Sequence, residues 1–162
     1  MTSAVLDEAL KKAALAWVAV GDGPALGLWC MPLEGALIVV TGPGEQYAPD
    51  LPGAARATVR LRGDNGGLIV VAEMTVARIL PGSDDWETAA PQLAAKRLNA
   101  HGSTDEVVTR WVETGCTVLR LSPAEDVTAP NLPAESAAAE PRETPARVEV
   151  RKPFRLHKVR RR

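Results

Sequence analysis

Apolar residues along the first 123 positions fall into short runs separated by turn-forming residues, a pattern typical of β-rich folds. An apolar stripe at helical spacing over residues 5–13 predicts a short N-terminal helix. Residues 15–20, 25–30 and 36–41 predict three strands, with Pro32 ending the second. The third is almost wholly apolar, which predicts burial on both of its faces.

The next two predicted strands form a hairpin. Residues 58–62 alternate between arginine or threonine on one side and valine or leucine on the other. The long run 68–80 follows an Asp-Asn-Gly-Gly sequence at 64–67, and Asn-Gly supplies the positive φ angles of a tight turn. We therefore expect the long run to pair back on the shorter strand.

Helical spacing then replaces the strand pattern. One helical region begins near Ser83 and is interrupted by Pro91, and a second begins at a capping box opened by Ser103 and stops at Gly115. Residues 116–121 predict a last strand. The order is one helix, five strands, a helical insertion and a final strand, which favours a small closed or split antiparallel barrel of the mainly β (α+β) class.

Composition divides the chain into three parts. Residues 1–123 carry 10 basic and 14 acidic side chains and form the predicted barrel domain. Residues 124–146 hold seven alanines, four prolines and no aromatic residue, which predicts an acidic disordered linker. Residues 147–162 hold eight basic residues and one acidic residue, so the overall net charge of −1 conceals a basic tail.

Several classes of protein are disfavoured by the composition. The longest apolar run is eight residues, whereas a membrane-spanning helix needs about 20. Two cysteines 86 positions apart and two histidines give neither a disulfide framework nor a set of metal ligands. A nucleophile–base pair requires a histidine oriented by a third group, and nothing near Ser103 or Cys116 supports one; His101 is most simply a solvated loop residue. No secretory signal is visible. We expect a cytoplasmic protein with no metal site.

The order and spacing of the predicted elements resemble the flavin-binding split β-barrel superfamily, the pyridoxamine 5′-phosphate oxidase-like proteins. These include flavin- and deazaflavin-dependent reductases common in actinobacteria. The resemblance rests on Leu-Ala-Trp-Val-Ala-Val at 15–20, Leu-Trp at 28–29, the strand and glycine loop at 35–44, the long strand at 67–77 and Arg-Leu-Ser-Pro at 120–123.

The resemblance implies a six-stranded antiparallel split β-barrel that forms a homodimer and holds FMN or a deazaflavin between its subunits. Thr41 and Gly42 match the positions that contact the ring and ribityl chain in that family. Trp29 ends the second predicted strand, where its indole either fills the core or stacks on a planar cofactor.

The chain departs from the family where the cofactor phosphate is bound. Residues 45–47 read Glu-Gln-Tyr instead of a serine followed by basic residues, and residues 24–25 read Pro-Ala where arginine is common. A carboxylate that faces a phosphate repels it. Arg60 and Arg62, on the polar side of their strand, either replace the missing cations or simply face solvent.

Two functions remain. The first is a flavin- or deazaflavin-dependent oxidoreductase acting on a small organic substrate, with no catalytic residue identified. The alternative is a non-catalytic split barrel that has lost its cofactor and acts as an interaction protein through its tail. The missing phosphate-binding residues favour the alternative, whereas the barrel pattern is compatible with both.

The basic tail interleaves its charges with apolar residues, partly at a period of two. It is either a solvated tail, a segment that docks on a protein as an extended strand, or an attractor of nucleic acid or anionic lipid. The apolar residues lead us to prefer docking over attraction by charge alone. The candidate partner-binding residues are Arg151, Lys152, Phe154, Arg155, Leu156 and Lys158.

Overall fold

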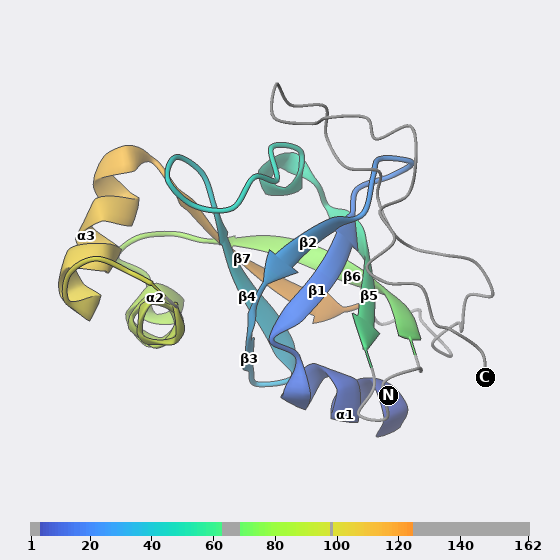
Figure 1. The fold of residues 1–162 in the computed structure, drawn as a ribbon. Helices are drawn as coiled ribbons and strands as arrows, with labels where there is room; N and C mark the ends of the chain where they lie inside the picture. Colours follow the sequence, from blue (N-terminus) through green and yellow to red (C-terminus); the bar gives the residue numbers. More distant parts are fainter. Residues whose placement is uncertain (1–3, 63–68, 98, 125–162) are drawn as a thin grey trace, which may run out of the picture.

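The computed structural model describes residues 4–62, 69–97 and 99–124, which form a small barrel with helices at one end and along one side (Figure 1). In chain order the elements are α1 (Ala4–Lys12), β1 (Leu15–Ala19), β2 (Leu26–Trp29), β3 (Met31–Leu33), β4 (Ala36–Thr41), the short 3₁₀ helix η1 (Leu51–Gly53), β5 (Arg56–Arg62), β6 (Ile69–Ile79), α2 (Asp84–Lys96), α3 (Thr104–Thr114) and β7 (Thr117–Pro123).

The described residues contain seven strands, so the expected number of six is wrong. All strand pairs are antiparallel, in the order β2-β1-β5-β6-β7-β4-β3. The extra strand is β3, which contains Pro32 and pairs with β4. A proline is tolerated on an edge strand, where its missing N–H faces away from the partner.

One bent segment nearly closes the barrel. The strands β2 and β3 lie at the two ends of the sheet, yet only Cys30 separates them in the chain. The Cys30 backbone N–H still donates to the carbonyl of Ala14, the residue before β1, at 3.1 Å, whereas Met31 already pairs with Ile38 of β4. The chain therefore changes partner at Cys30, from β1 to β4, and the barrel is split there.

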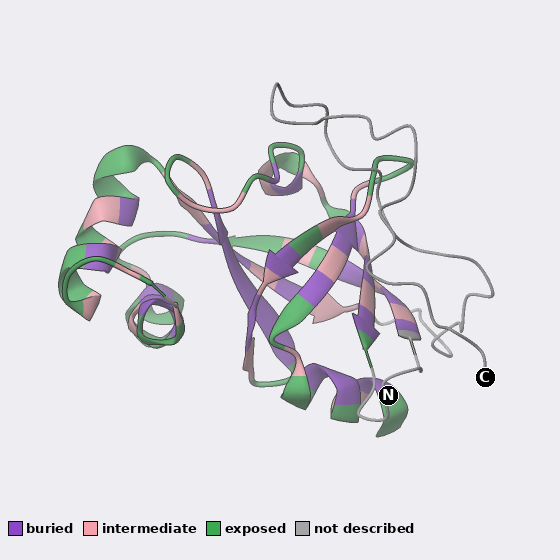
Figure 2. Ribbon diagram, viewed as in Figure 1, coloured by how far each residue is buried: buried purple, intermediate pink, exposed green. Residues whose placement is uncertain are grey.

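The strand β4 is buried along its whole length, as its apolar sequence predicted (Figure 2). Leu37 and Val39 point into the barrel, where they pack with residues from α1 and the other strands. Ile38 and Val40 point outward, where they pack beneath α2 and α3. This strand thus separates two apolar cores.

The helix α2 continues through Pro91, so the predicted interruption is wrong. Ser83 caps its start by accepting a hydrogen bond from the Trp86 N–H at 3.2 Å. Proline removes one backbone donor in the helix interior. Burial of Ala89, Ala90 and Leu93 against the outer face of the sheet holds the helix together on both sides of it.

The predicted boundaries of α3 are confirmed. Ser103 and Glu106 form both hydrogen bonds of a capping box, and Gly115 ends the helix in the left-handed conformation. No helix in the described part of the chain is long and apolar enough to span a bilayer. The predicted turn at 64–67, residues 125–146 of the predicted linker and the basic tail lie outside the described residues.

Candidate functional site

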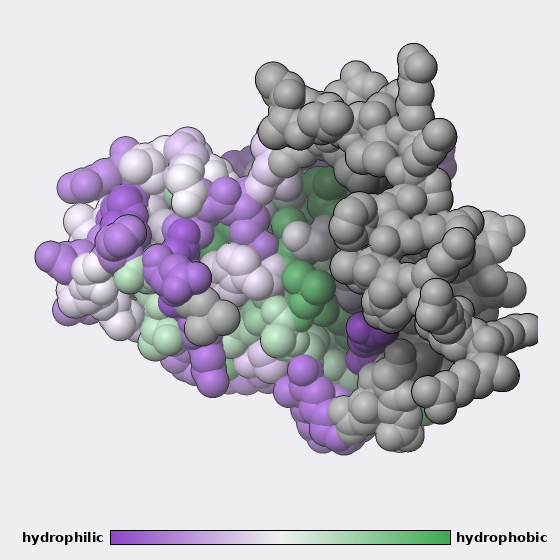
Figure 3. Space-filling model, viewed as in Figure 1, coloured by the Kyte–Doolittle hydropathy of each residue, from purple (hydrophilic) through white to green (hydrophobic). Residues whose placement is uncertain are grey.

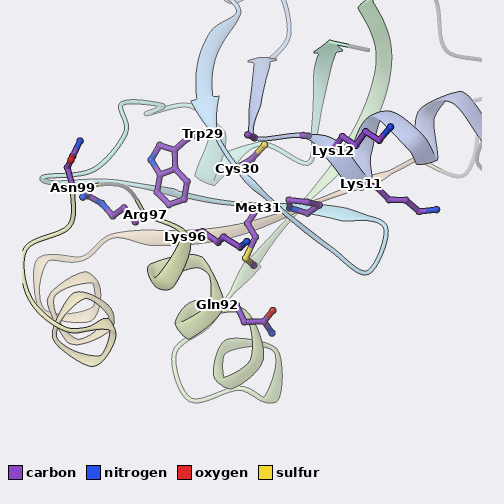
Figure 4. Close-up of a pocket in the computed structure, with 12 residues that line it drawn as sticks. Lys11, Lys12, Trp29, Cys30, Met31, Gln92, Lys96, Arg97 and Asn99 are labelled. Atoms are coloured by element: carbon purple, nitrogen blue, oxygen red, sulfur yellow. The ribbon is translucent and has the colours of Figure 1, made fainter. Parts of the chain in front are cut away.

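A cleft of about 720 Å³ opens where the end of α1, the junction of β2 with β3, and the end of α2 meet (Figure 4). The three elements are brought together by the barrel closure at Cys30 and by the packing of α2 against β3 and β4. The lining residues are Lys11, Lys12, Ala13, Ala14, Trp29, Cys30, Met31, Pro32, Gln92, Lys96, Arg97 and Asn99.

The cleft combines an aromatic ring with positive charge. Trp29 is half-buried at its edge, and basic residues of two helices line the cleft. In Figure 4 the Lys96 side chain extends toward Met31, whereas those of Lys11 and Lys12 extend away from Trp29. Lys11 and Lys12 are in the last turn of α1, and Lys96 and Arg97 lie at the end of α2. Basic residues at helix C-termini complement the helix dipole. Here the C-terminal ends of two helices, α1 and α2, both lie at the cleft.

Trp29 could be identified from the sequence, but these cations could not. Each is an ordinary basic residue at the end of a helix, and α1 and α2 are more than 70 positions apart in the chain. Nothing local distinguishes Lys11 or Lys96 from other surface lysines. The signal is the convergence of two helix ends, which appears only in the folded chain.

Gln46 bridges the split in the barrel. Its side-chain Oε1 accepts a hydrogen bond from the Trp29 backbone N–H at 2.6 Å. Its Nε2 donates to the Trp29 carbonyl at 3.0 Å and to the Val40 carbonyl at 3.2 Å. The carboxamide thus takes the place of a strand between β2 and β4, and it fixes the backbone that carries the Trp29 indole.

Glu45 points into the protein, so the expectation that its carboxylate faces a cofactor phosphate is wrong. Its side chain is only 3% exposed, and Oε2 lies 2.7 Å from Arg97 Nε in an ion pair. Its Oε1 accepts a hydrogen bond from Trp111 Nε1 at 2.9 Å. The carboxylate therefore ties the loop after β4 to α3 and to the end of α2.

Thr41 and Gly42 line a separate, smaller cavity of about 300 Å³, together with Tyr47 and Thr117. Thr41 is 3% exposed. Gly42 has φ +137°, and a Cβ atom built on it would lie 2.8 Å from the Cys116 Cα, so a side chain does not fit there. Within one chain, these two residues do not share the cleft of Trp29.

Arg60 and Arg62 lie on β5 and line neither cavity. Arg60 is half-buried beside its cross-strand partner Trp17, and its Nε is buried without a hydrogen-bond partner. Arg62 is exposed. The five predicted cofactor-binding residues therefore occupy three separate places on the subunit. Of these, the Trp29 cleft has the larger volume and is lined by basic side chains, of which Lys12 is ion-paired with Glu8 at 2.6 Å and Arg97 with Glu45 at 2.7 Å.

Other chemistry is sparse in the described part of the chain. It contains no group of three or more His, Cys, Asp and Glu residues that could hold a metal ion. Burial raises the pKa of the Cys30 thiol to about 12, so this thiol is a poor nucleophile near neutral pH. His101 is exposed in the connection between α2 and α3.

No protein-family model matches the chain, and no curated protein matches it in sequence. Solved structures do match. An FAD-binding protein from Mesorhizobium loti aligns with 76% of this chain and 91% of its own, at 15% identity and a TM-score of 0.52. HutZ, the heme storage protein from Vibrio cholerae, aligns with 77% and 92%, at 10% identity and a TM-score of 0.50. At these identities the comparisons establish the fold alone: the chain shares the barrel architecture of these two structures.

Proposed function

We propose that the protein binds a flavin-type cofactor, FMN or a deazaflavin, in the cleft beside Trp29. The observation that carries the proposal is the meeting of an indole with cationic side chains from two helix ends around one cleft. The fold is shared with an FAD-binding protein, which supports a flavin over other planar anions.

The residues of the cleft fit such a group. A cleft of about 720 Å³ falls within the roughly 300–1,000 Å³ typical of cofactor and ligand sites. The Trp29 indole would stack on the ring system, and Met31 and Pro32 would provide apolar contact. Lys11, Lys96 and Arg97 would hold the phosphate by charge-assisted hydrogen bonds.

A bound flavin would supply two-electron transfer, and the protein would bind it, orient it and limit access of water. The reaction would be oxidation or reduction of a small organic substrate. None of the described residues that line the cleft is a histidine or a carboxylate, and its lysines would hold the phosphate, so a proton for the substrate would come from water.

A second candidate is a barrel that functions without a cofactor, as an interaction protein. The contacts of Glu45 and Gln46 favour it, because the loop that would hold a phosphate in the family is here held by the protein's own groups.

Heme, the ligand of HutZ, is less suited to the cleft. Haem iron takes His, Met, Cys thiolate or Tyr ligands, and the sulfur atoms in the lining belong to the buried Met31 and Cys30.

Titration of the full-length protein with FMN, riboflavin and hemin tests the proposal. We expect FMN fluorescence to be quenched on binding, and Trp29→Ala to weaken FMN binding by about tenfold through loss of stacking. Trp17→Ala is the matched control, because Trp17 is also half-buried but lies outside the cleft, and it should change the affinity by less than about twofold. Absence of flavin binding, or equal effects of the two variants, would contradict the proposal.

We also propose a homodimer. Apolar side chains gather over β1 and β2 in the space-filling view (Figure 3). Leu15 on β1 is 44% exposed. Sedimentation equilibrium at micromolar concentration tests the proposed dimer, and a monomer would contradict it.

The proposed docking role of the basic tail has its own test. Replacement of Phe154 and Leu156 by serine should abolish binding to a protein partner, whereas moderate salt should not. A purely electrostatic tail would show the reverse, with affinity for a polyanion falling steeply as salt rises. Loss of capture in moderate salt, without an effect of the two substitutions, would contradict docking.

A further inference from the structure

Two consecutive residues of the loop after β4 hold two residues that line the cleft. Gln46 binds the backbone of Trp29, which carries the aromatic ring. Glu45 binds the guanidinium of Arg97, which lines the cleft from the end of α2. Figure 4 shows Trp29 and Arg97 on the same side of the cleft. One short loop thus fixes an aromatic and a cationic side chain relative to each other.

We infer that Glu45 is a positioning residue that orients Arg97 for the phosphate of the cofactor, an inference that rests on the proposed function. The carboxylate would act through Arg97 and would not touch the ligand. It would therefore determine how well the cleft distinguishes a phosphorylated flavin from an unphosphorylated one.

The geometry supports this role because both carboxylate oxygens are engaged and buried. Oε1 is anchored by the indole N–H of Trp111, a residue with 0% exposure, so the carboxylate has a fixed position. Oε2 then holds Arg97 Nε at 2.7 Å, and Arg97 Nη2 lies 3.5 Å from the Gly44 carbonyl. A planar guanidinium gripped along one edge is held in a set direction.

The contact between Glu45 and Arg97 matters because Arg97 lies where α2 ends. Arg97 is the C-cap residue of α2, with extended backbone angles, so the helix no longer constrains it. Its side chain is 20% exposed and would otherwise sample many rotamers. Contact with Glu45 removes that freedom before a ligand arrives, which lowers the entropy cost of binding a phosphate.

Gln46 provides a contrast within the same loop. It contacts the backbone of Trp29 and Val40 and no cationic side chain. Loss of its carboxamide should disturb the ring-binding side of the cleft. It should therefore weaken FMN and riboflavin to the same extent.

The test compares the affinities of FMN and riboflavin, which differ by the phosphate alone, in variants of the full-length protein. Glu45→Asp keeps the charge but shortens the side chain, so it cannot keep contact with both Arg97 and Trp111. We expect FMN affinity to fall about tenfold, the scale of one charge-assisted hydrogen bond, and riboflavin affinity to change less than twofold. Glu87→Asp, on the exposed face of α2, is the matched control and should change neither.

A second measurement needs no ligand. In NMR spectra of the free protein, the Nε–H of Arg97 and the indole N–H of Trp111 should exchange slowly with water. Glu45→Asp should accelerate the exchange of at least one of them, and Glu87→Asp should not. Fast exchange of both groups in the unaltered protein would overturn the inference.

The outcomes separate this inference from the proposed function. If the unaltered protein binds neither flavin, the proposed function fails and the inference fails with it. If it binds both, and Glu45→Asp leaves the ratio of FMN to riboflavin affinity unchanged, the inference alone is overturned. An equal loss of both ligands would likewise show that Glu45 supports the fold without orienting Arg97.

Discussion

Replacement of Gln46 by alanine should destabilise the barrel, because its carboxamide occupies the split between β2 and β4. The substitution leaves the Trp29 N–H, the Trp29 carbonyl and the Val40 carbonyl without their partner. Each such hydrogen bond contributes about 0.5–1.5 kcal/mol net. Three would give about 3 kcal/mol, but the site is only half-buried and water can replace part of the loss. We expect about 2 kcal/mol.

Urea unfolding measures this loss. With a slope of about 1–3 kcal/mol per molar urea, the midpoint should fall by roughly 1 M. The control is Gln92→Ala, whose side chain is exposed on α2 and donates only to the Thr88 carbonyl one turn earlier. That change should cost less than about 0.5 kcal/mol. Equal midpoints for the two variants would refute a structural role for the Gln46 carboxamide.

The near-isosteric change Gln46→Glu adds a pH signature. A carboxylate there would face the carbonyl oxygens of Trp29 and Val40, which favours the protonated acid and raises its folded-state pKa above the unfolded value. A raised folded-state pKa stabilises the fold below the unfolded pKa of about 4.3, and this stabilisation is lost as pH rises. Relative to the unaltered protein, this variant should therefore be least impaired in acid. A constant difference from pH 4 to 8 would contradict the geometry.

Three further predictions concern other parts of the barrel. Gly42→Ala should destabilise the protein by about 2 kcal/mol or more, because the added Cβ would lie 2.8 Å from the Cys116 Cα. Gly53→Ala is the control: a Cβ there would have nothing within 4 Å, so the change should be nearly neutral in the same urea assay. Burial raises the pKa of the Cys30 thiol from 9.0 to about 12, so Cys30 should resist alkylation at pH 8 in the native protein. The stability that it contributes should be lost as pH rises from 9 to about 12, and this fall in the free energy of unfolding should be absent in Cys30→Ala. Hydrogen bonds from Ser103 lower the pKa of Glu106, so the stability it contributes should be lost as pH falls through that lowered value, and Glu106→Gln should flatten the acid limb of the stability curve.

Local patterns were enough to predict most of the strands and both ends of α3. The all-apolar sequence of β4 predicted burial on both faces, and the capping box predicted the start of α3. The extra strand β3 was missed because Pro32 is also a common strand terminator, and its acceptance depends on β3 being an edge. The persistence of α2 through Pro91 likewise depends on packing that a local pattern does not contain.

The candidate site was harder to predict than the fold, because its contacts span long stretches of chain. Glu45 contacts Arg97, which is 52 positions away in the sequence, and Trp111, which is 66 positions away. From the sequence, Glu45 and Gln46 were interpreted as residues facing a ligand. Both side chains are instead occupied by the protein itself, and the cations that line the cleft come from helix ends the sequence did not single out.

The most direct test of the central claim is residue-resolved mapping of FMN binding by amide NMR on the full-length protein. If the cofactor binds in the cleft, the largest shift changes should fall on Trp29, Met31, Lys96 and Arg97, and saturate with FMN concentration. Changes centred instead on Thr41 and Gly42, or no saturable change, would contradict a flavin site beside Trp29.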